Sequence, residues 1–159
     1  MQDITVNNVI KVHLTQQGFE ELQSELDLLK SKEPAAVDRI TKAREFGDLT
    51  ENSEYHAARE DLALIQGRID ELEDLLARSK IINTTASNGT VELGCQVTVA
   101  HDGMHTTFVI VGEYEADPMK KKISHDSPLG RALLGRKVGE KVEFEAPVGK
   151  VIYTVKKIH

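Results

Sequence analysis

The feature that most constrains the fold is a regular row of apolar residues in the second quarter of the chain. Its steps alternate between four and three residues, and its members are Ala58, Leu62, Ile65, Ile69, Leu72 and Leu76. This spacing places all of them along one face of an α-helix, where the side chains of a second helix can fit between them. The row therefore predicts one long helix that packs lengthwise against another.

An earlier run of the chain supplies the partner helix. Its apolar residues follow similar steps, less regularly towards the end, and are Leu22, Leu26, Leu29, Val37, Ile40 and Ala43. Thr15 is suited to cap the start of this run, and Gly47 suits the chain reversal that follows it. Pro34 predicts a bend, because proline lacks the amide donor that a helix interior needs. We therefore expect an antiparallel coiled-coil hairpin of two helices of about 30 residues, or about 45 Å, each, in a first domain of residues 1–80.

Beyond residue 80 the pattern changes to short segments with alternating apolar and polar positions. Four such segments are rich in β-branched residues and read CQVTVA, TTFVIVG, EKVEFEA and KVIYTVKKI. Glycine-containing turns at residues 101–103 and 147–149 predict that neighbouring segments pair antiparallel. Ser127 and Pro128 mark the start of one short helix that ends at Gly135. The chain is thus predicted to be an α+β protein whose second domain, residues 81–159, is an antiparallel sheet with one short helix.

Composition and charge narrow the classes of function. Residues 1–80 hold 17 acidic and 10 basic residues, a net charge of −7, and residues 81–159 hold 9 and 10, a net charge of +1, which gives −6 for all 159 residues. An acidic chain repels the phosphate backbone, which argues against general nucleic-acid binding. Because Cys95 is the single cysteine, an internal disulfide is excluded and a reducing, cytoplasmic location is expected.

Two further expectations concern the first residues of the sequence and the stretch between the two predicted domains. The first residues, MQDITVNNVIKVHL, lack the basic and apolar regions of a signal peptide, and no stretch approaches the ~20 apolar residues of a membrane span. No membrane partner is therefore expected. The stretch IINTTASNGT, residues 81–90, is rich in Asn, Thr and Ser and predicts a linker between the two domains.

The stretch EFGDLTENSEY, residues 45–55, concentrates acidic residues where the helical pattern reverses. One interpretation is structural, since Asp48 and Glu51 have the spacing of a capping box at the start of the second helix. The other is chemical. Mg²⁺ takes one or two protein carboxylates and completes its octahedron with other oxygens, so the two acids form an incomplete cation site. No cofactor would be bound stably by this chain alone, and another molecule would have to supply the remaining ligands.

Two longer segments carry a resemblance to a known family. The segments AREFGDLTENSEYHAAREDLALIQGRIDELE and ISHDSPLGRALLGRKVGE, together with the proline of the first helix, resemble the bacterial Gre transcript-cleavage factors, which act in transcription elongation. The resemblance covers nearly the whole chain in the same order. It implies a coiled-coil hairpin followed by an FKBP-like domain. It also implies a partner, RNA polymerase, whose secondary channel the coiled coil enters.

The resemblance implies a mechanism as well. In the family, acids at the tip, which match Asp48 and Glu51 here, help hold a second Mg²⁺ in the polymerase active centre, and the polymerase itself then hydrolyses the backtracked RNA. A protein of this kind is a cofactor of the polymerase and not an enzyme. Glu54 and Tyr55 are expected to support the tip acids.

Two further groups of residues have both a functional and a structural interpretation. The basic residues that the resemblance implies to contact the extruded RNA 3′ end are Lys42, Arg44 and Arg59. For Arg44 and Arg59 the alternative is pairing with neighbouring acids on the helix surface, namely Glu45, Glu51 or Glu60. The residues that match the family's docking segment at the rim of the channel are Asp126, Ser127 and Pro128. The structural interpretation of this segment is that it caps the start of the short helix.

Three other functions remain open on the sequence. The same acids could serve a free-standing metal-dependent nuclease, although a convex tip offers no pocket for a substrate. The FKBP-like half could be a prolyl isomerase, although the aromatic residues for its cavity are few, namely Phe108, Tyr114, Phe144 and Tyr153. A Gre paralogue could occupy the channel and inhibit the polymerase. The presence of both Asp48 and Glu51 argues against this function. No small-molecule substrate is expected.

Overall fold

The computed structural model describes residues 11–83 and 88–159. Residues 1–10, on which the expected absence of a signal peptide mainly rests, and residues 84–87 of the linker expected at residues 81–90 lie outside this description. The chain divides into two compact units. One unit, called here the hairpin unit, is Phe19–Arg78, and the other, called the β unit, combines Met1–Gly18 with Ser79–His159. Among the described residues, no helix combines the length and apolar character needed to cross a membrane.

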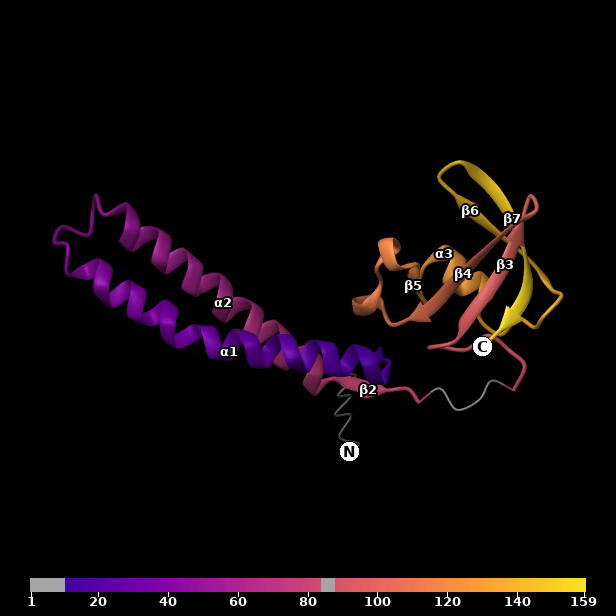
Figure 1. The fold of residues 1–159 in the computed structure, drawn as a ribbon, viewed down its shortest axis with the longest axis horizontal. Helices are drawn as coiled ribbons and strands as arrows, with labels where there is room; N and C mark the ends of the chain where they lie inside the picture. The colour runs from indigo at the N-terminus through magenta and orange to yellow at the C-terminus, as the bar shows by residue number, and fades with distance from the viewer. Residues whose placement is uncertain (1–10, 84–87) are drawn as a thin grey trace, which may run out of the picture. The chain divides into compact units, whose positions relative to one another are not determined.

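Two long helices form the hairpin (Figure 1). Helix α1 spans Gln16–Arg44 and helix α2 spans Ser53–Ala77, and Figure 1 shows them running side by side from the turn that joins them. The residues buried between the helices are Leu26, Ile69 and Leu72, with Leu22, Leu29, Ile65 and Leu76 packed around them. The predicted coiled-coil hairpin is therefore confirmed. Val37 departs from the predicted stripe, because 46% of its surface is exposed.

Ion pairs connect the two helices outside this apolar seam. Arg68 of α2 donates to both carboxylate oxygens of Glu25 in α1, at 2.7 and 3.1 Å, and to Glu71 at 2.8 Å. These hydrogen bonds raise the pKa of the Arg68 guanidinium. Helix α1 is continuous through Pro34, and the bend expected there stays a prediction.

A five-stranded sheet forms the body of the β unit. Its strands are β3 (Gln96–His101), β4 (Met104–Val111), β5 (Lys122–Ser124), β6 (Lys141–Ala146) and β7 (Gly149–Ile158). They lie in the order β5-β4-β3-β7-β6, and only the β4–β5 pair is parallel. The four predicted strand segments correspond to β3, β4, β6 and β7. The sequence missed β5, which has three residues and lies between two 3₁₀ turns and a helix.

One short helix, α3 (Pro128–Leu133), covers a face of this sheet and completes the core. Ser127 caps it by accepting a hydrogen bond from the Gly130 amide at 3.0 Å, and Pro128 is its first residue. Gly135 follows the helix with φ of +76°, a conformation that favours glycine. Leu133 is fully buried within the core cluster of the sheet. The predicted α+β fold, with a helical hairpin and a sheet carrying one short helix, is confirmed.

A second, two-stranded sheet holds the segments that flank the hairpin. Strand β1 (Val12–Leu14) precedes α1, and strand β2 (Ser79–Ile81) follows α2. The two strands pair in parallel, and Leu14 is fully buried. Three residues are too few to show a periodic pattern, so the sequence missed both strands. Their pairing brings the start and the end of the helical hairpin together in the β unit.

Candidate functional site

The turn between α1 and α2 is built by local backbone hydrogen bonds. The amides of Glu45 and Gly47 donate to the carbonyls of Lys42 and Arg44, at 3.2 and 3.4 Å. Gly47 has φ of +106° and no atom lies within 4 Å of where a Cβ would be. A glycine is needed here for its backbone conformation and not for space. The predicted role of Gly47 in the reversal is therefore confirmed.

The residue that caps α2 is Asn52, which the sequence analysis did not single out. Its Oδ1 accepts from the Tyr55 amide at 3.0 Å, and its Nδ2 donates to the Ala43 carbonyl at 2.8 Å. Asn caps helices about as well as Asp, and its amide can also donate to the last turn of α1, which a carboxylate cannot do. The capping-box interpretation of Asp48 and Glu51 was therefore wrong.

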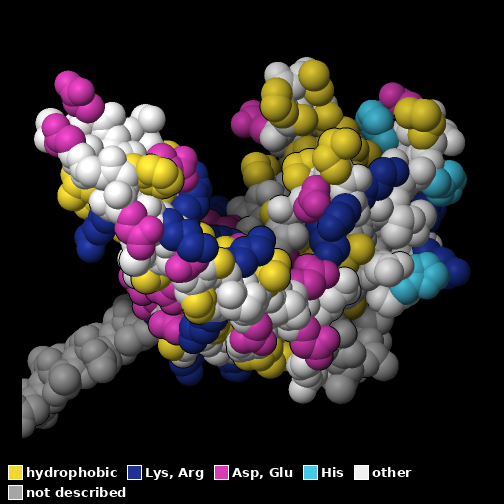
Figure 2. All heavy atoms as spheres, turned by 60° about the vertical axis from the view of Figure 1, so that its left-hand side comes forward, with side chains coloured by type: hydrophobic (Ala, Val, Ile, Leu, Met, Phe, Trp, Pro, Cys, Tyr) yellow, Lys and Arg dark blue, Asp and Glu magenta, His cyan; other side chains and the backbone are white. Residues whose placement is uncertain are grey.

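Asp48 and Glu51 are left exposed at the tip, which is defined here as residues 45–52. Figure 2 shows acidic side chains at the outermost point of the hairpin. Asp48 Oδ1 accepts from the Thr50 amide at 2.9 Å. This bond, with a second from the Thr50 hydroxyl, lowers the pKa of the Asp48 carboxyl. Glu51 makes no hydrogen bond or ion pair with any residue that the structure describes.

Glu54 differs from Asp48 and Glu51 because it forms an ion pair with Arg39. Arg39 donates to Glu54 at 2.6 Å and also pairs with Asp61. The two hydrogen bonds raise the pKa of the Arg39 guanidinium. The three acids predicted for the tip thus fall into two kinds. Asp48 and Glu51 present carboxylate oxygens to solvent, whereas Glu54 joins the first turn of α2 to α1 through Arg39.

Tyr55 lies under two arginine side chains next to the tip. The ring is 8% exposed, and the guanidinium carbons of Arg44 and Arg59 each lie 5.7 Å from its centre. A hydrogen bond from Arg44, aided by the positive charge of Arg59, lowers the pKa of the Tyr55 hydroxyl. These residues line a hollow of about 540 Å³ together with Ile40, Leu62, Ala63 and Gln66.

The three basic residues predicted near the tip differ in their partners. Lys42 pairs with Asp38 at 2.7 Å. Arg44 and Arg59 form no ion pair with an acid within the described part of the chain. The alternative expected for the two arginines, pairing with Glu45, Glu51 or Glu60, is therefore not observed among the described residues. Both guanidinium groups face the hollow beside Tyr55 and can donate hydrogen bonds to a phosphate.

The acids at the tip fit one part of a magnesium site and not the whole of it. Among residues 11–83 and 88–159, no three His, Cys, Asp or Glu side chains are grouped to hold a metal ion. Two carboxylates with free oxygens match the protein contribution that Mg²⁺ usually takes. The donor set of Asp48 and Glu51 therefore suits an ion whose other ligands come from a second molecule.

The segment Asp126–Pro128 lies in the β unit before α3. Ser127 Oγ donates to the Ser124 carbonyl at 2.7 Å and accepts from Gly130, so the predicted cap is confirmed. Asp126 and Pro128 are exposed. Asp126 lies 3.7 Å from Arg131, a loose surface ion pair. The cap holds the segment in shape while its neighbours remain accessible.

The aromatic residues of the β unit pack on one another. Tyr153 stacks on Phe144 with ring centres 5.4 Å apart and contacts Phe108 at 6.3 Å. Phe108 and Tyr153 also pack against the buried core, and Tyr114 is 49% exposed. The structure thus uses three of these four rings for packing at the edge of the core.

Fold and site together define a class of protein. It combines a two-helix hairpin that has exposed carboxylates at its tip with a β-sheet unit that carries one short helix. Two family models match consecutive parts of the chain. The first is described as "Transcription elongation factor, N-terminal" and matches residues 12–81. The second, "Transcription elongation factor, GreA/GreB, C-term", matches residues 86–159.

Relatives agree with these models over most of the chain. Transcription elongation factor GreA of Rhodospirillum rubrum is 45% identical over 149 residues, which cover 91% of this chain and 95% of the relative. GreA of Bacillus subtilis is 43% identical over 148 residues, covering 91% and 94%. The chain belongs to the GreA/GreB family of transcription elongation factors. It is accordingly a transcription factor by family.

Among solved structures, GreA factor homolog 1 (Gfh1) of Thermus thermophilus is 32% identical, with a TM-score of 0.45 and coverage of 94% of this chain and 99% of that protein. A GreA/GreB factor from Nitrosomonas europaea is 21% identical, with a TM-score of 0.41 and coverage of 93% and 98%.

Proposed function

We propose that this protein binds bacterial RNA polymerase, inserts its helical hairpin into the secondary channel and stimulates the polymerase's own cleavage of backtracked RNA. The observation that carries the proposal is the state of the tip acids. Asp48 and Glu51 do not cap α2, because Asn52 does so, and Glu51 has no partner among the described residues. In a member of an elongation factor family, carboxylates kept free at the end of a hairpin are available to a partner's active centre.

The chemistry assigned to the tip follows from its two carboxylates. Asp48 and Glu51 would hold a Mg²⁺ ion that the polymerase supplies, and that ion would provide the activation of water for phosphodiester hydrolysis. Asp48 accepts from the Thr50 amide, which orients the carboxylate while the side chain remains exposed. Glu51 has an unrestrained carboxylate that can adjust to the geometry of the completed site.

Residues around the tip would guide the RNA and the docking. Arg44 and Arg59 face the hollow beside Tyr55, and guanidinium groups bind phosphate oxygens in pairs of hydrogen bonds. They would therefore contact the extruded RNA 3′ end. In the β unit, the exposed Asp126 and Pro128 beside the Ser127 cap would dock at the rim of the channel.

A free-standing nuclease is less well supported by the geometry. The residues that line the hollow next to the tip do not include Asp48 or Glu51. An enzyme needs a site that encloses its substrate and excludes water. Two exposed carboxylates on a turn provide neither, so cleavage should depend on the polymerase.

The test compares RNA cleavage with and without the polymerase. Purified protein is mixed with Mg²⁺ and either free RNA or a backtracked polymerase–RNA complex, and the released 3′ fragments are measured over time. We expect cleavage of the complex to be faster with the protein than without it, and free RNA to remain intact. Cleavage of free RNA would support the nuclease instead. Binding to the polymerase with slower cleavage than in its absence would support the inhibitory paralogue.

A further inference from the structure

One aromatic side chain at the tip of the hairpin is exposed to solvent. Phe46 lies in the turn after α1, and 82% of its surface is exposed. The other three phenylalanines of the chain, Phe19, Phe108 and Phe144, are all partly buried. The Phe46 amide donates to the Ala43 carbonyl at 3.3 Å, so the backbone fixes the residue in the turn. Its side chain makes no ring contact with any residue that the structure describes, and the fold therefore leaves this ring available to another molecule.

Phe46 lies between groups of opposite charge. Arg44 precedes it by two residues, and Asp48 follows it by two. Each residue extends the chain by at most about 3.6 Å, so the backbone from Arg44 to Asp48 spans no more than roughly 14 Å. A stacked nucleic-acid strand rises about 3.4 Å per nucleotide. The segment is therefore short enough for a few consecutive nucleotides to contact all three residues.

The tip and the hollow beside it contain the two kinds of group that bind a single strand of RNA. Surfaces that bind single strands place cations along the phosphates and aromatic rings against the bases. Arg44 and Arg59 supply two guanidinium groups that pair with no acid in the described part of the chain, and Phe46 supplies the ring. Asp48 and Glu51 repel a phosphate by themselves, but a Mg²⁺ ion held by these acids reverses the sign of the local charge.

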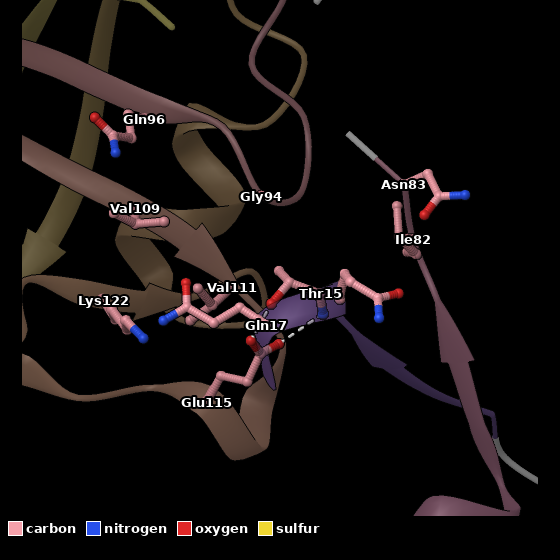
Figure 3. Close-up of a pocket in the computed structure, with 11 residues that line it drawn as sticks. Thr15, Gln17, Ile82, Asn83, Gly94, Gln96, Val109, Val111, Glu115 and Lys122 are labelled. Carbon is pink, nitrogen blue, oxygen red and sulfur yellow. Dashed lines mark hydrogen bonds between the residues drawn. The ribbon is translucent and has the colours of Figure 1, made fainter. Parts of the chain in front are cut away.

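A cavity in the β unit lacks this combination of groups (Figure 3). Its volume is about 550 Å³, and the described residues that line it include one cation, Lys122, and no aromatic ring. Figure 3 shows its carboxylate, Glu115, pointing at Thr15. Glu115 accepts from the amides of Thr15 and Gly112, at 2.9 and 3.2 Å, and from the Thr15 hydroxyl, and Gly18 and Gly112 leave room for it. The carboxylate of this cavity is thus engaged within the β unit, whereas the ring at the tip has no partner there.

A nucleobase suits the Phe46 ring better than an apolar pocket of a partner protein does. To bury Phe46 in such a pocket, the charged side chains of Arg44 and Asp48 beside it would have to lose water, which is costly for groups without a partner. A base can stack on one face of the ring. The neighbouring charges then stay in water or contact the phosphates. The charges on both sides of Phe46 therefore favour RNA as the molecule that covers it.

We propose that Phe46 stacks on a base of the extruded RNA and helps to hold the 3′ segment at the tip. The proposal rests on the proposed function, because that function brings the RNA to the hairpin. Every base has a flat face, so the contact tolerates any sequence. Loss of the ring should weaken binding of the factor to the backtracked complex and leave the chemistry of the tip acids unchanged. The half-saturating concentration for cleavage should therefore rise more than the rate at saturation falls.

The first measurement combines one change in the protein with one change in the RNA. Backtracked polymerase complexes are assembled on RNA whose extruded nucleotides carry either all of their bases or none. On intact RNA, Phe46→Leu keeps an apolar side chain and removes the ring, and should raise the half-saturating concentration by about tenfold, within the range for one stacked base. On abasic RNA, this variant and the wild type should differ by less than about twofold. Equal values on intact RNA would overturn the proposal. An undiminished difference on abasic RNA would also overturn it and would assign Phe46 to an apolar contact with the polymerase.

Matched variants separate stacking from general effects of the substitution. Phe46→Trp keeps an aromatic ring and should bind at least as well as the wild type. Leu64→Ala removes an apolar side chain that is 68% exposed in α2, outside the tip, and should change the half-saturating concentration by less than about twofold. Phe46→Leu should leave the thermal midpoint of unfolding unchanged, because the residue is exposed. An equal loss in Leu64→Ala and Phe46→Leu would indicate unspecific apolar attraction and overturn the proposal.

The second measurement does not depend on cleavage. The protein carries Asp48→Asn and Glu51→Gln, which remove both the repulsion of phosphate and the expected stimulation of cleavage. Its complex with backtracked polymerase is irradiated with 4-thiouridine in the extruded RNA, and the cross-linked residue is located by mass spectrometry. We expect an adduct at Phe46 that is lost when Phe46→Leu is added. Adducts confined to the polymerase would overturn the proposal. An adduct at Phe46, combined with a wild-type protein that does not stimulate cleavage, would refute the proposed function and leave the RNA contact in place.

Discussion

The tip of the hairpin and the place where α1 begins use carboxylates in opposite ways. At the tip, Glu51 has no partner among the described residues, and Asp48 is exposed and bonded only to the neighbouring Thr50 among them. At the start of α1, the Glu115 carboxylate accepts three hydrogen bonds and two glycines give it space. A carboxylate whose oxygens are all engaged stabilises the protein that carries it. One that is left free is available to another molecule. The two regions should therefore respond differently to substitution.

The largest effect on folding should come from the seam of the hairpin and not from the tip. Leu72 is 1% exposed, so Leu72→Ala should lower the free energy of unfolding by about 3 kcal/mol. Leu49, in the tip, is 38% exposed, and Leu49→Ala should cost less than about 1 kcal/mol. Denaturant unfolding measured by circular dichroism checks both values. Equal losses would mean that the tip contributes to the core.

The largest effect on activity should come from the tip acids. Asp48→Asn keeps the oxygen that accepts from Thr50, and Glu51→Gln changes no contact within the described chain. Each should leave the thermal midpoint of unfolding unchanged and lower the cleavage rate roughly a hundredfold, the size typical of losing one electrostatic contact to the transition state. Cleavage assays with backtracked complexes measure the rate. Wild-type rates in both variants would remove the tip acids from the mechanism.

A smaller effect is expected at Asn52, which belongs to the tip but serves the fold. Asn52→Ala removes the cap of α2 and the bond to Ala43, and should lower stability by about 1–2 kcal/mol. Asn52→Asp restores the cap and not the bond to Ala43, so it should recover part of the loss. Thermal unfolding of the three proteins gives the order. If Asn52→Asp were as unstable as Asn52→Ala, the bond to Ala43 would be the dominant contact.

The arginines over Tyr55 should affect cleavage modestly and in a salt-dependent way. Arg44→Ala and Arg59→Ala each remove one cation from the hollow beside the tip. Each should raise the protein concentration needed for half-maximal cleavage by about three- to tenfold at low salt, with a smaller difference at high salt, since each phosphate contact adds about one to the salt slope. Lys42→Ala is the control, because Lys42 is paired with Asp38. An effect of Lys42→Ala equal to the others would indicate general charge attraction.

The smallest expected effect concerns the titration of Asp48. Hydrogen bonds from Thr50 lower the pKa of this carboxyl below its ordinary value of 3.8. The folded state therefore favours the charged form. The resulting contribution to stability is present above pH 3.8 and is lost as the pH falls through the lower folded pKa. Thr50→Val removes the hydroxyl and keeps the amide, so the pKa should rise part of the way. Carbon NMR of the Asp48 carboxyl carbon measures it, and an unchanged value would assign the whole effect to the amide.

Local periodicity explains what the sequence predicted well. The stripe from Ala58 to Leu76 and the alternating segments after residue 80 report which side chains face a core, because helices and strands repeat every 3.6 and 2 residues. Gly47, Ser127 and Gly135 mark ends of elements through their own backbone preferences. These signals are contained within a few neighbouring residues. The hairpin, four of the strands and the short helix could therefore be predicted.

Local sequence signals do not decide which residue of the tip caps α2. Asp48 and Asn52 are both good caps on local grounds, and the acidic spacing favoured the former. The choice was made by a contact of Asn52 with Ala43, in the other helix. Likewise, nothing near Glu54 in sequence indicates Arg39 as its partner. Pairings between helices depend on how two elements meet, which no local pattern records.

By itself the sequence determined the two helices that pack together, the sheet segments, the exposed acidic turn between the helices and the family. Only the tertiary structure decided which carboxylates are free and which are engaged. It paired β1 with β2 across more than 60 positions and placed Glu115 on Thr15, 100 positions away. The physical reason is that elements form from local backbone preferences and apolar repeats. A hydrogen bond between distant segments exists only after packing has brought its donor and acceptor within reach.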